Sequence, residues 1–250
     1  MKFKILRSSR RGQSGHYETY EVPTGPGMTV LDALFKIQET HDGSLAFRYS
    51  CRGAVCGSCA MTINREPRLA CRTQVEGLTR MKPMGLSLFR GLEKAVDWDW
   101  ANEILIEPLP NLPVTKDLVV DQTKFFEAYR KIKPWFEPNE SETAFSKVMP
   151  DQAERIDRYL NCILCAACFG ACPVCEKDPS YVGPAALAVS ERFLADVRIP
   201  DKVKRLELVA GKDAAPACEF VYNCVKVCPK GVAPALAIRS IRDSLEAARH

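Results

Sequence analysis

The chain has 250 residues, of which 46% are hydrophobic and 26% are charged, and its formal net charge is +4. This composition excludes a disordered chain, and the length allows one large or two ordinary domains. The small net charge comes from many residues of both signs, so we expect no nucleic-acid partner. We expect neither a secretory signal nor a membrane span, because no long apolar run follows the basic start or occurs later.

The first hundred residues predict a small mixed sheet with one helix packed on it. Alternating apolar residues predict strands at 2–7 and 17–22. An amphipathic helix is expected over 29–41, with Thr29 and Asp32 as a short capping box. Further short strands are expected at 44–50, 60–64 and 103–108.

The twelve cysteines form three groups, and the first group has the spacing Cys51-x4-Cys56-x2-Cys59 with a distant Cys71. This is the pattern of plant-type [2Fe–2S] ferredoxins, in which three thiolates on one loop and a fourth nearby surround a compact anionic cluster. Gly53 and Gly57 would let the loop backbone direct N–H groups at the sulfurs. A zinc site would more typically use paired C-x2-C knuckles. Disulfides are not expected, since closely spaced cysteines without a secretory signal indicate metal.

A proline-bearing segment over 106–121 reads as a linker, so we place a domain boundary near Ile106. The predicted domains are therefore 1–106 and 107–250, and the predicted fold class is α+β. The second domain is expected to be mostly helical, with short cysteine-bearing turns between helices at 122–132, 151–160, 184–197, 201–209 and 234–248.

The second cysteine group is a complete bacterial ferredoxin run, and the third is the same run with one ligand missing. The second contains Cys162, Cys165, Cys168 and Cys172, followed by Pro173. The third contains Cys218, Cys224 and Cys228, followed by Pro229, and has Val221 in the second cysteine position. In such runs the fourth cysteine ligates the other cluster.

Pairing the two runs in this way gives one complete and one incomplete site. Cys162, Cys165, Cys168 and Cys228 would hold a [4Fe–4S] cluster. Cys172, Cys218 and Cys224 would leave a cubane one thiolate short, which favours a [3Fe–4S] cluster of higher potential. Cys175 could restore the fourth ligand and give a second [4Fe–4S] cluster, or it could be a buried free thiol.

Three clusters in one chain indicate an electron relay. The sequence has no nucleotide-binding glycine motif, and its three histidines are expected to be solvated surface groups. We therefore expect no catalytic residue in this chain, and we assign the chemistry at either end of the relay to partner chains.

The order of the motifs resembles the iron–sulfur subunit of succinate dehydrogenase and fumarate reductase. The matching segments are RYSCRGAVCGSCAMTIN, RLACRT, CILCAACFGACP, GPAALA and CVKVCPKGVAP. The resemblance implies a β-grasp [2Fe–2S] domain followed by a helical domain with [4Fe–4S] and [3Fe–4S] clusters, with the same ligand assignment. It also implies electron transfer between the FAD of a flavoprotein subunit and quinone at a cytochrome b membrane anchor. The chain would lie peripherally on the cytoplasmic face of the membrane.

Two positions depart from the ubiquinone-using members of that family. Those members usually carry a tryptophan after the second run and a histidine after the first cysteine of the third, where this chain has Lys177 and Glu219. The departure favours menaquinone, with a quinone-facing surface around Pro173, Val174 and Glu219. Succinate oxidation and fumarate reduction both remain open. The alternatives are a freestanding soluble multi-cluster electron carrier and the iron–sulfur subunit of a related flavoprotein reductase.

Overall fold

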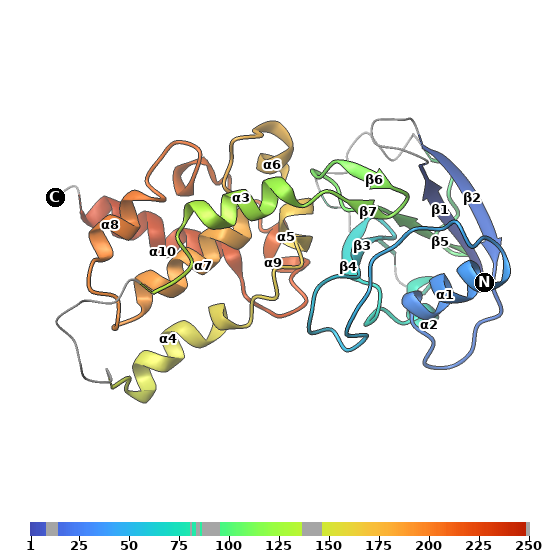
Figure 1. Cartoon of the computed structure of the whole chain (residues 1–250), viewed down its shortest axis with the longest axis horizontal. Helices are drawn as coiled ribbons and strands as arrows, with labels where there is room; N and C mark the ends of the chain where they lie inside the picture. The colour runs from blue at the N-terminus through green and yellow to red at the C-terminus, as the bar shows by residue number, and fades with distance from the viewer. Residues whose placement is uncertain (9–14, 81, 84–85, 87–95, 137–146, 249–250) are drawn as a thin grey trace. The chain divides into compact units, whose positions relative to one another are not determined.

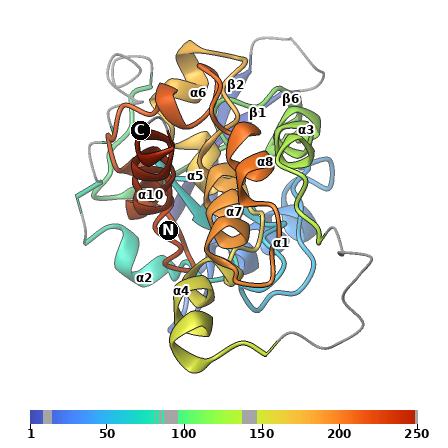
Figure 2. The ribbon, with the colours of Figure 1, turned by 90° about the vertical axis from the view of Figure 1, so that its left-hand side faces the viewer.

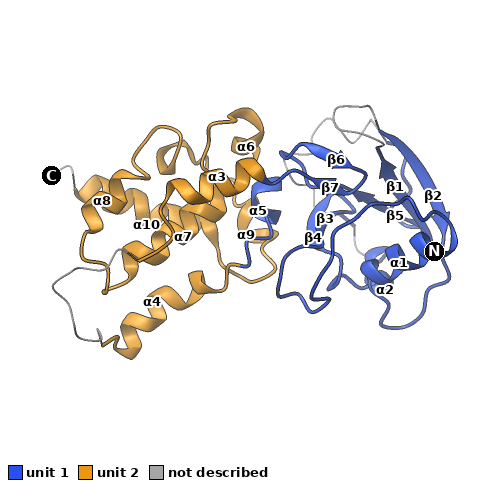
Figure 3. Ribbon diagram, viewed as in Figure 1, with its two compact units in different colours: residues 1–122, 163–171 blue, residues 123–162, 172–250 orange. Residues whose placement is uncertain are grey.

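A computed structural model describes residues 1–8, 15–80, 82–83, 86, 96–136 and 147–248. The chain divides into two compact units, shown in separate colours in Figure 3. Unit 1 comprises Met1–Gln122 together with Ile163–Ala171, and unit 2 comprises Thr123–Cys162 and Cys172–His250. The segment that carries two cysteines of the second group therefore belongs to the first unit.

Unit 1 is built on a mixed sheet of five strands in the order β2-β1-β5-β3-β4 (Figure 1). The central pair, β1 and β5, is parallel, while β1–β2, β3–β4 and β3–β5 are antiparallel. This arrangement confirms the predicted β-grasp domain. The strands are β1 (Lys2–Arg7), β2 (His16–Glu21), β3 (Ala60–Ile63), β4 (Glu66–Leu69) and β5 (Glu103–Glu107).

Helix α1 (Val30–Thr40) supplies the apolar layer of this unit. Its predicted capping box is present: Asp32 N donates to Thr29 Oγ1 at 3.2 Å, and Thr29 N donates to Asp32 Oδ2 at 2.9 Å. The two bonds satisfy N–H groups that a helix start leaves without partners. The buried face of α1 comprises Val30, Leu31, Ala33, Leu34 and Ile37.

The predicted strand at 44–50 is wrong, because these residues form an irregular segment. Its apolar alternation has another cause: the rings of Phe47 and Tyr49 pack edge-on against Phe35 of α1, with centroids 5.4 and 4.6 Å away. Its backbone is partly satisfied outside any ladder, since Ala46 N donates to the carboxylate of Asp117 at 2.9 Å. Before β5, the strand β4 and the short helix α2 (Val75–Leu78) are further elements that the sequence did not predict.

The proline-bearing segment after β5 forms a hairpin within unit 1. Its strands are β6 (Val114–Lys116) and β7 (Val119–Val120), and the predicted boundary at residue 106 falls inside β5. The turn between β6 and β7 is attached to the sheet because Asp117 accepts hydrogen bonds from Ser8 N at 2.9 Å and from Arg7 Nε at 3.2 Å. This attachment explains why the compact unit continues to Gln122.

Unit 2 is helical, as predicted, and α7 (Pro184–Ala195) lies at its centre. It is buried along most of its length and packs against α10 (Pro234–Ala247), α4 (Pro150–Leu160), α8 (Lys202–Glu207) and α3 (Thr123–Lys131) (Figure 2). Pro184 and Pro234 each occupy the first turn of their helix, where a missing N–H costs nothing. In the part of the chain that the structure describes, no helix is both long and apolar enough to span a membrane.

Candidate iron–sulfur cluster sites

The loop of the first cysteine group surrounds the Cys51 sulfur with backbone donors. The N–H groups of Gly53, Val55 and Cys56 donate to Cys51 Sγ at 3.4, 3.3 and 3.3 Å. Hydrogen bonds of this kind stabilise negative charge on a thiolate and on a cluster bound to it. The expectation that Gly53 directs an N–H at a sulfur is therefore confirmed.

The other three cysteines of this group lie close to Cys51 and to one another. Cys51 N donates to Cys56 Sγ, and Cys71 N donates to Cys59 Sγ, both at 3.5 Å. The Ser58 hydroxyl, followed by backbone N–H groups, lowers the pKa of Cys56 to about 6. Burial, followed by the interactions with Cys71 and Cys56, raises the pKa of Cys59 to about 12. The structure thus brings all four predicted cysteines together. Their thiolates would repel one another, and bound iron would offset this repulsion.

Gly57 places the first cysteine loop directly against the second cysteine run, within unit 1. A Cβ added at Gly57 would lie 2.7 Å from Cys165 Cβ, 2.9 Å from Cys165 Cα and 3.0 Å from the carbonyl oxygen of Ile163. The Gly57 φ of 74° is also left-handed, which disfavours residues that carry a Cβ. Sequence spacing did not indicate this close approach, because the two loops are a hundred residues apart along the chain.

The segment Ile163–Ala171 is held to unit 1 by further contacts. Asn111 Nδ2 donates to the carbonyl oxygens of Phe169 and Gly170 at 3.0 and 3.2 Å. These carbonyls belong to the last two residues of the four-residue helix α5 (Ala167–Gly170). Cys165 and Cys168, both buried, are therefore fixed relative to the first cysteine loop.

The second and third cysteine runs share an unusual backbone. Left-handed residues flank the second cysteine position of each run: Leu164 and Ala166 (φ 51° and 61°) in one, Phe220 and Tyr222 (φ 51° and 63°) in the other. A four-residue helix follows in each case, α5 in the first and α9 (Asn223–Lys226) in the second. Cys165 and Val221 therefore occupy equivalent positions, as the spacing predicted.

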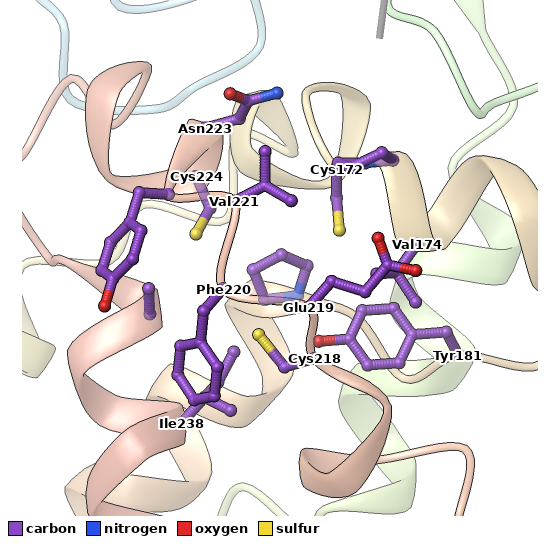
Figure 4. A pocket seen from close by; sticks show the side chains of 14 residues that line it. Cys172, Val174, Tyr181, Cys218, Glu219, Phe220, Val221, Asn223, Cys224 and Ile238 are labelled. Carbon is purple, nitrogen blue, oxygen red and sulfur yellow. The ribbon is translucent and has the colours of Figure 1, made fainter. Parts of the chain in front are cut away.

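The three cysteines of the incomplete set line one pocket in unit 2 (Figure 4). It contains about 330 Å³ of atom-free space, open mouth included, and Val221 forms part of its wall. Burial raises the pKa of Cys224 to about 12, and the nearby Cys172 and Cys218 raise it further. The donor set of three cysteines fits a cluster with three thiolate ligands. Among the described residues, no three His, Cys, Asp or Glu side chains are placed to hold a single metal ion.

Cys175 is buried in α6 (Pro173–Lys177) and does not line this pocket. Its side chain is hydrogen-bonded to that of Cys172, and this bond is the largest cause that lowers the pKa of Cys172 to about 7. Cys175 therefore contacts the predicted ligand Cys172 without lining the pocket itself.

The four cysteines of the predicted [4Fe–4S] set are divided between the units. In unit 2, Cys162 and Cys228 pack against one buried apolar cluster formed by Ala188, Val232 and Ala237. Val232 N also donates to Cys228 Sγ at 3.4 Å. In unit 1 lie Cys165 and Cys168, as described above.

The residues predicted to face quinone lie at the pocket wall. Pro173, Val174 and Glu219 line the pocket, and Glu219 pairs with Lys177, whose Nζ lies 3.0 and 3.1 Å from the two carboxylate oxygens. Both partners of this ion pair are exposed. One further pocket residue that the sequence did not indicate is Tyr181, which shortly precedes the helix α7.

Neither of the two histidines that the structure describes lines the pocket of the third site. His16 and His41 are exposed, and His16 Nε2 lies 2.8 Å from a Glu18 carboxylate oxygen. His250 lies outside the described residues.

Two family models match the chain: one covers the first cysteine group, and the other covers the second and third groups. Residues 2–127 match a 2Fe-2S iron-sulfur cluster binding domain, and residues 158–232 match a 4Fe-4S dicluster domain. The described fold also resembles that of a chain of the Mycobacterium smegmatis Sdh1 complex in the apo form, with a TM-score of 0.81 and 24% identity. That match covers 99% of this chain and 95% of the other.

Curated relatives match over nearly the full length. The fumarate reductase iron-sulfur subunit of Haemophilus influenzae is 35% identical over 95% of this chain and 90% of its own. The fumarate reductase iron-sulfur subunit of Mycobacterium tuberculosis is 36% identical over 94% and 87%. A mitochondrial succinate dehydrogenase [ubiquinone] iron-sulfur subunit of Oryza sativa is 34% identical over 96% and 73%. The chain therefore belongs to the family of iron–sulfur subunits of fumarate reductase and succinate dehydrogenase.

Proposed function

We propose that this chain carries electrons between the FAD of a flavoprotein subunit and quinone at a membrane anchor, through [2Fe–2S], [4Fe–4S] and [3Fe–4S] clusters. The observation that carries the proposal is the contact at Gly57, where the first cysteine loop lies against Cys165 of the second run. Two cluster loops in van der Waals contact allow electrons to pass over a short distance. The names of the relatives, succinate dehydrogenase and fumarate reductase, supply the reaction at the flavin end.

Each cluster has its own set of thiolates in this proposal. Cys51, Cys56, Cys59 and Cys71 hold [2Fe–2S], and the backbone donors at Cys51 Sγ stabilise its negative charge. The [4Fe–4S] cluster is held by Cys162, Cys165, Cys168 and Cys228. The spacing of Cys162, Cys165 and Cys168 within one short run supports this assignment.

The third site holds [3Fe–4S] on Cys172, Cys218 and Cys224. Val221 occupies the backbone position that corresponds to Cys165, and a valine side chain supplies no fourth ligand. Cys175 acts as a hydrogen-bond partner of Cys172 in this proposal, which is supported by its place outside the pocket lining. With fewer thiolates, this cluster has the higher potential and suits the acceptor end of the relay.

The quinone end of the relay lies at Pro173, Val174 and Glu219, and the quinone is menaquinone. Support comes from the Lys177–Glu219 ion pair, which occupies the positions where ubiquinone-using relatives usually carry tryptophan and histidine. The chain sits peripherally on the cytoplasmic face of the membrane, attached to a cytochrome b anchor subunit. The same site serves succinate oxidation or fumarate reduction, depending on the potential of the quinone.

The test compares Cys224→Ala with Cys175→Ala in the purified complex of this chain with its flavoprotein and anchor. Cys224→Ala should abolish the EPR signal of the oxidised [3Fe–4S] cluster and quinone-coupled turnover. It should leave succinate-dependent reduction of the [2Fe–2S] cluster in place. Cys175→Ala should retain the signals of all three clusters.

Two outcomes would contradict the proposal. If Cys224→Ala kept quinone-coupled turnover, the third site would not belong to the relay. If the chain purified without partners and reacted as a free ferredoxin, the alternative of a freestanding carrier would replace it.

A further inference from the structure

Tyr181 is a buried tyrosine whose hydroxyl group makes no hydrogen bond of ordinary geometry. The residue is 2% exposed, and within the described part of the chain no protein group meets the usual distance and angle limits for a bond to this hydroxyl. Buried hydroxyl groups are nearly always hydrogen-bonded, because their removal from water is unfavourable. A buried hydroxyl without a well-formed hydrogen bond therefore indicates an acceptor within the pocket that Tyr181 lines.

The ring is held in place by the backbone on both sides. Tyr181 N donates to Asp178 O at 3.2 Å, and Val182 N donates to Asp213 O at 2.9 Å. Helix α7 begins three residues later, at Pro184, which also lines the pocket. The ring therefore has little freedom to turn the hydroxyl elsewhere.

The hydroxyl points into the pocket toward the cysteines of the third site (Figure 4). Its end of the ring lies near Cys218, with Cys172 across the same space. Burial raises the pKa of Tyr181, and negative charge on Cys218 and Cys172 raises it further, so the group stays a neutral O–H donor. Burial raises the pKa of Cys218, while the N–H of Phe220 and the Tyr181 hydroxyl partly offset that effect.

We propose that Tyr181 donates an O–H···S hydrogen bond to the cluster held by Cys172, Cys218 and Cys224, and thereby raises its reduction potential. The acceptor is either Cys218 Sγ or an inorganic sulfide of the cluster. A donor to sulfur stabilises the more negative, reduced state, so the bond favours electron acceptance. Tyr181 is a positioning residue in this role: it binds no iron and transfers no proton. The proposal rests on the proposed [3Fe–4S] site.

The packing of the ring does not explain why the residue at position 181 carries a hydroxyl group. A phenylalanine would fill the same space beside Val174 without burying a polar atom that lacks a well-formed hydrogen bond. Among the described residues that line the pocket, Glu219 is the charged one; it pairs with Lys177, and both side chains are exposed. The sulfur-rich interior is the acceptor that the hydroxyl faces.

The test is the midpoint potential of the [3Fe–4S] EPR signal in the intact complex carrying Tyr181→Phe. The potential of this cluster should fall, while the potentials of the [2Fe–2S] and [4Fe–4S] clusters stay unchanged. The matched control is Tyr159→Phe, which removes a hydroxyl from α4. The Tyr159 ring packs against the apolar side chains of Ala188, Val232 and Ala237. It should leave the [3Fe–4S] potential at the wild-type value.

A spectroscopic readout identifies the bond itself. Proton ENDOR of the wild-type complex in H2O and D2O should show one exchangeable coupling that is absent from Tyr181→Phe. An unchanged potential in Tyr181→Phe, with the EPR signal intact, would overturn the proposal. A wild-type complex without any [3Fe–4S] signal would instead overturn the proposed site.

If Tyr181→Phe lost the cluster, a fluorinated tyrosine would supply the decisive measurement. Its hydroxyl is a stronger donor of nearly the same size, so its incorporation should raise the [3Fe–4S] potential in the complex. No rise would overturn the proposed hydrogen bond.

Discussion

The substitution Gly57→Ala should damage the junction between the first and second cluster loops. The added Cβ would lie 2.7 Å from Cys165 Cβ and 3.0 Å from the Ile163 carbonyl oxygen, whereas carbon atoms pack at about 3.5–4.0 Å. The loops must therefore separate by roughly 1 Å. The φ of 74° adds strain of about 1–2 kcal/mol for a residue with a Cβ.

Backbone strain and overpacking together should lower the folding free energy of Gly57→Ala by about 2–4 kcal/mol. The functional consequence is slower electron transfer from the first cluster to the second, because transfer rates fall steeply with distance. Rapid-freeze EPR after mixing the complex with succinate would follow the reduction of each cluster. The [2Fe–2S] signal should appear at the wild-type rate, while the [4Fe–4S] cluster is reduced later or is lost.

Gly53→Ala is the matched control in the same loop. A Cβ at Gly53 meets only the Cys51 carbonyl oxygen at 3.6 Å, and the substitution retains the N–H that donates to Cys51 Sγ. This variant should behave as the wild type. If Gly57→Ala matched Gly53→Ala in both thermal stability and reduction kinetics, the reasoning from the close approach would be refuted.

Three further substitutions test other parts of the molecule. Val221→Cys should convert the third cluster to [4Fe–4S] and lower its potential; a retained [3Fe–4S] signal would mean that position 221 does not face the missing corner. Burial raises the pKa of Glu191 from 4.5 to about 7, so the folded protein holds this side chain in its neutral form. Folding free energy of up to about 3 kcal/mol is therefore lost as pH rises through this range. Glu191→Gln should therefore raise Tm more at about pH 8 than at about pH 5, and an equal difference at both pH values would refute the pKa argument. Arg7→Met should cost about 3–5 kcal/mol by leaving the buried Asp117 carboxylate without its cation, whereas Arg80→Met at an exposed pair should change Tm little.

The features that follow from short-range sequence patterns were predicted well. The capping box at Thr29 and the proline starts at Pro184 and Pro234 are local signals, and the corresponding helices begin at or near the predicted residues. The equivalence of Cys165 and Val221 also follows from spacing within short runs. The [2Fe–2S] and [4Fe–4S] types were predictable for the same reason, since ligand spacing on one loop is a local property, whereas the [3Fe–4S] assignment stays a prediction.

The features that the sequence did not reveal depend on contacts between distant residues. The alternating segment at 44–50 packs its rings on Phe35 instead of joining the sheet. The segment after β5 is not a free linker, because Asp117 accepts hydrogen bonds from Ser8 and Arg7, which lie about a hundred residues earlier in the chain. Tyr181 likewise has no sequence signature, since only the fold shows that its hydroxyl faces three cysteines.

The measurement that tests the central claim most directly is iron analysis of the purified complex combined with low-temperature EPR. The account predicts about nine irons per copy of this chain, beyond any haem, together with a [3Fe–4S] signal in the oxidised state. Reduction should reveal the [2Fe–2S] signal first and the [4Fe–4S] signal at lower potential. About ten irons and no signal from the oxidised complex would mean that Cys175 or another ligand completes a second cubane, and would contradict the assignment of Val221 as the open corner.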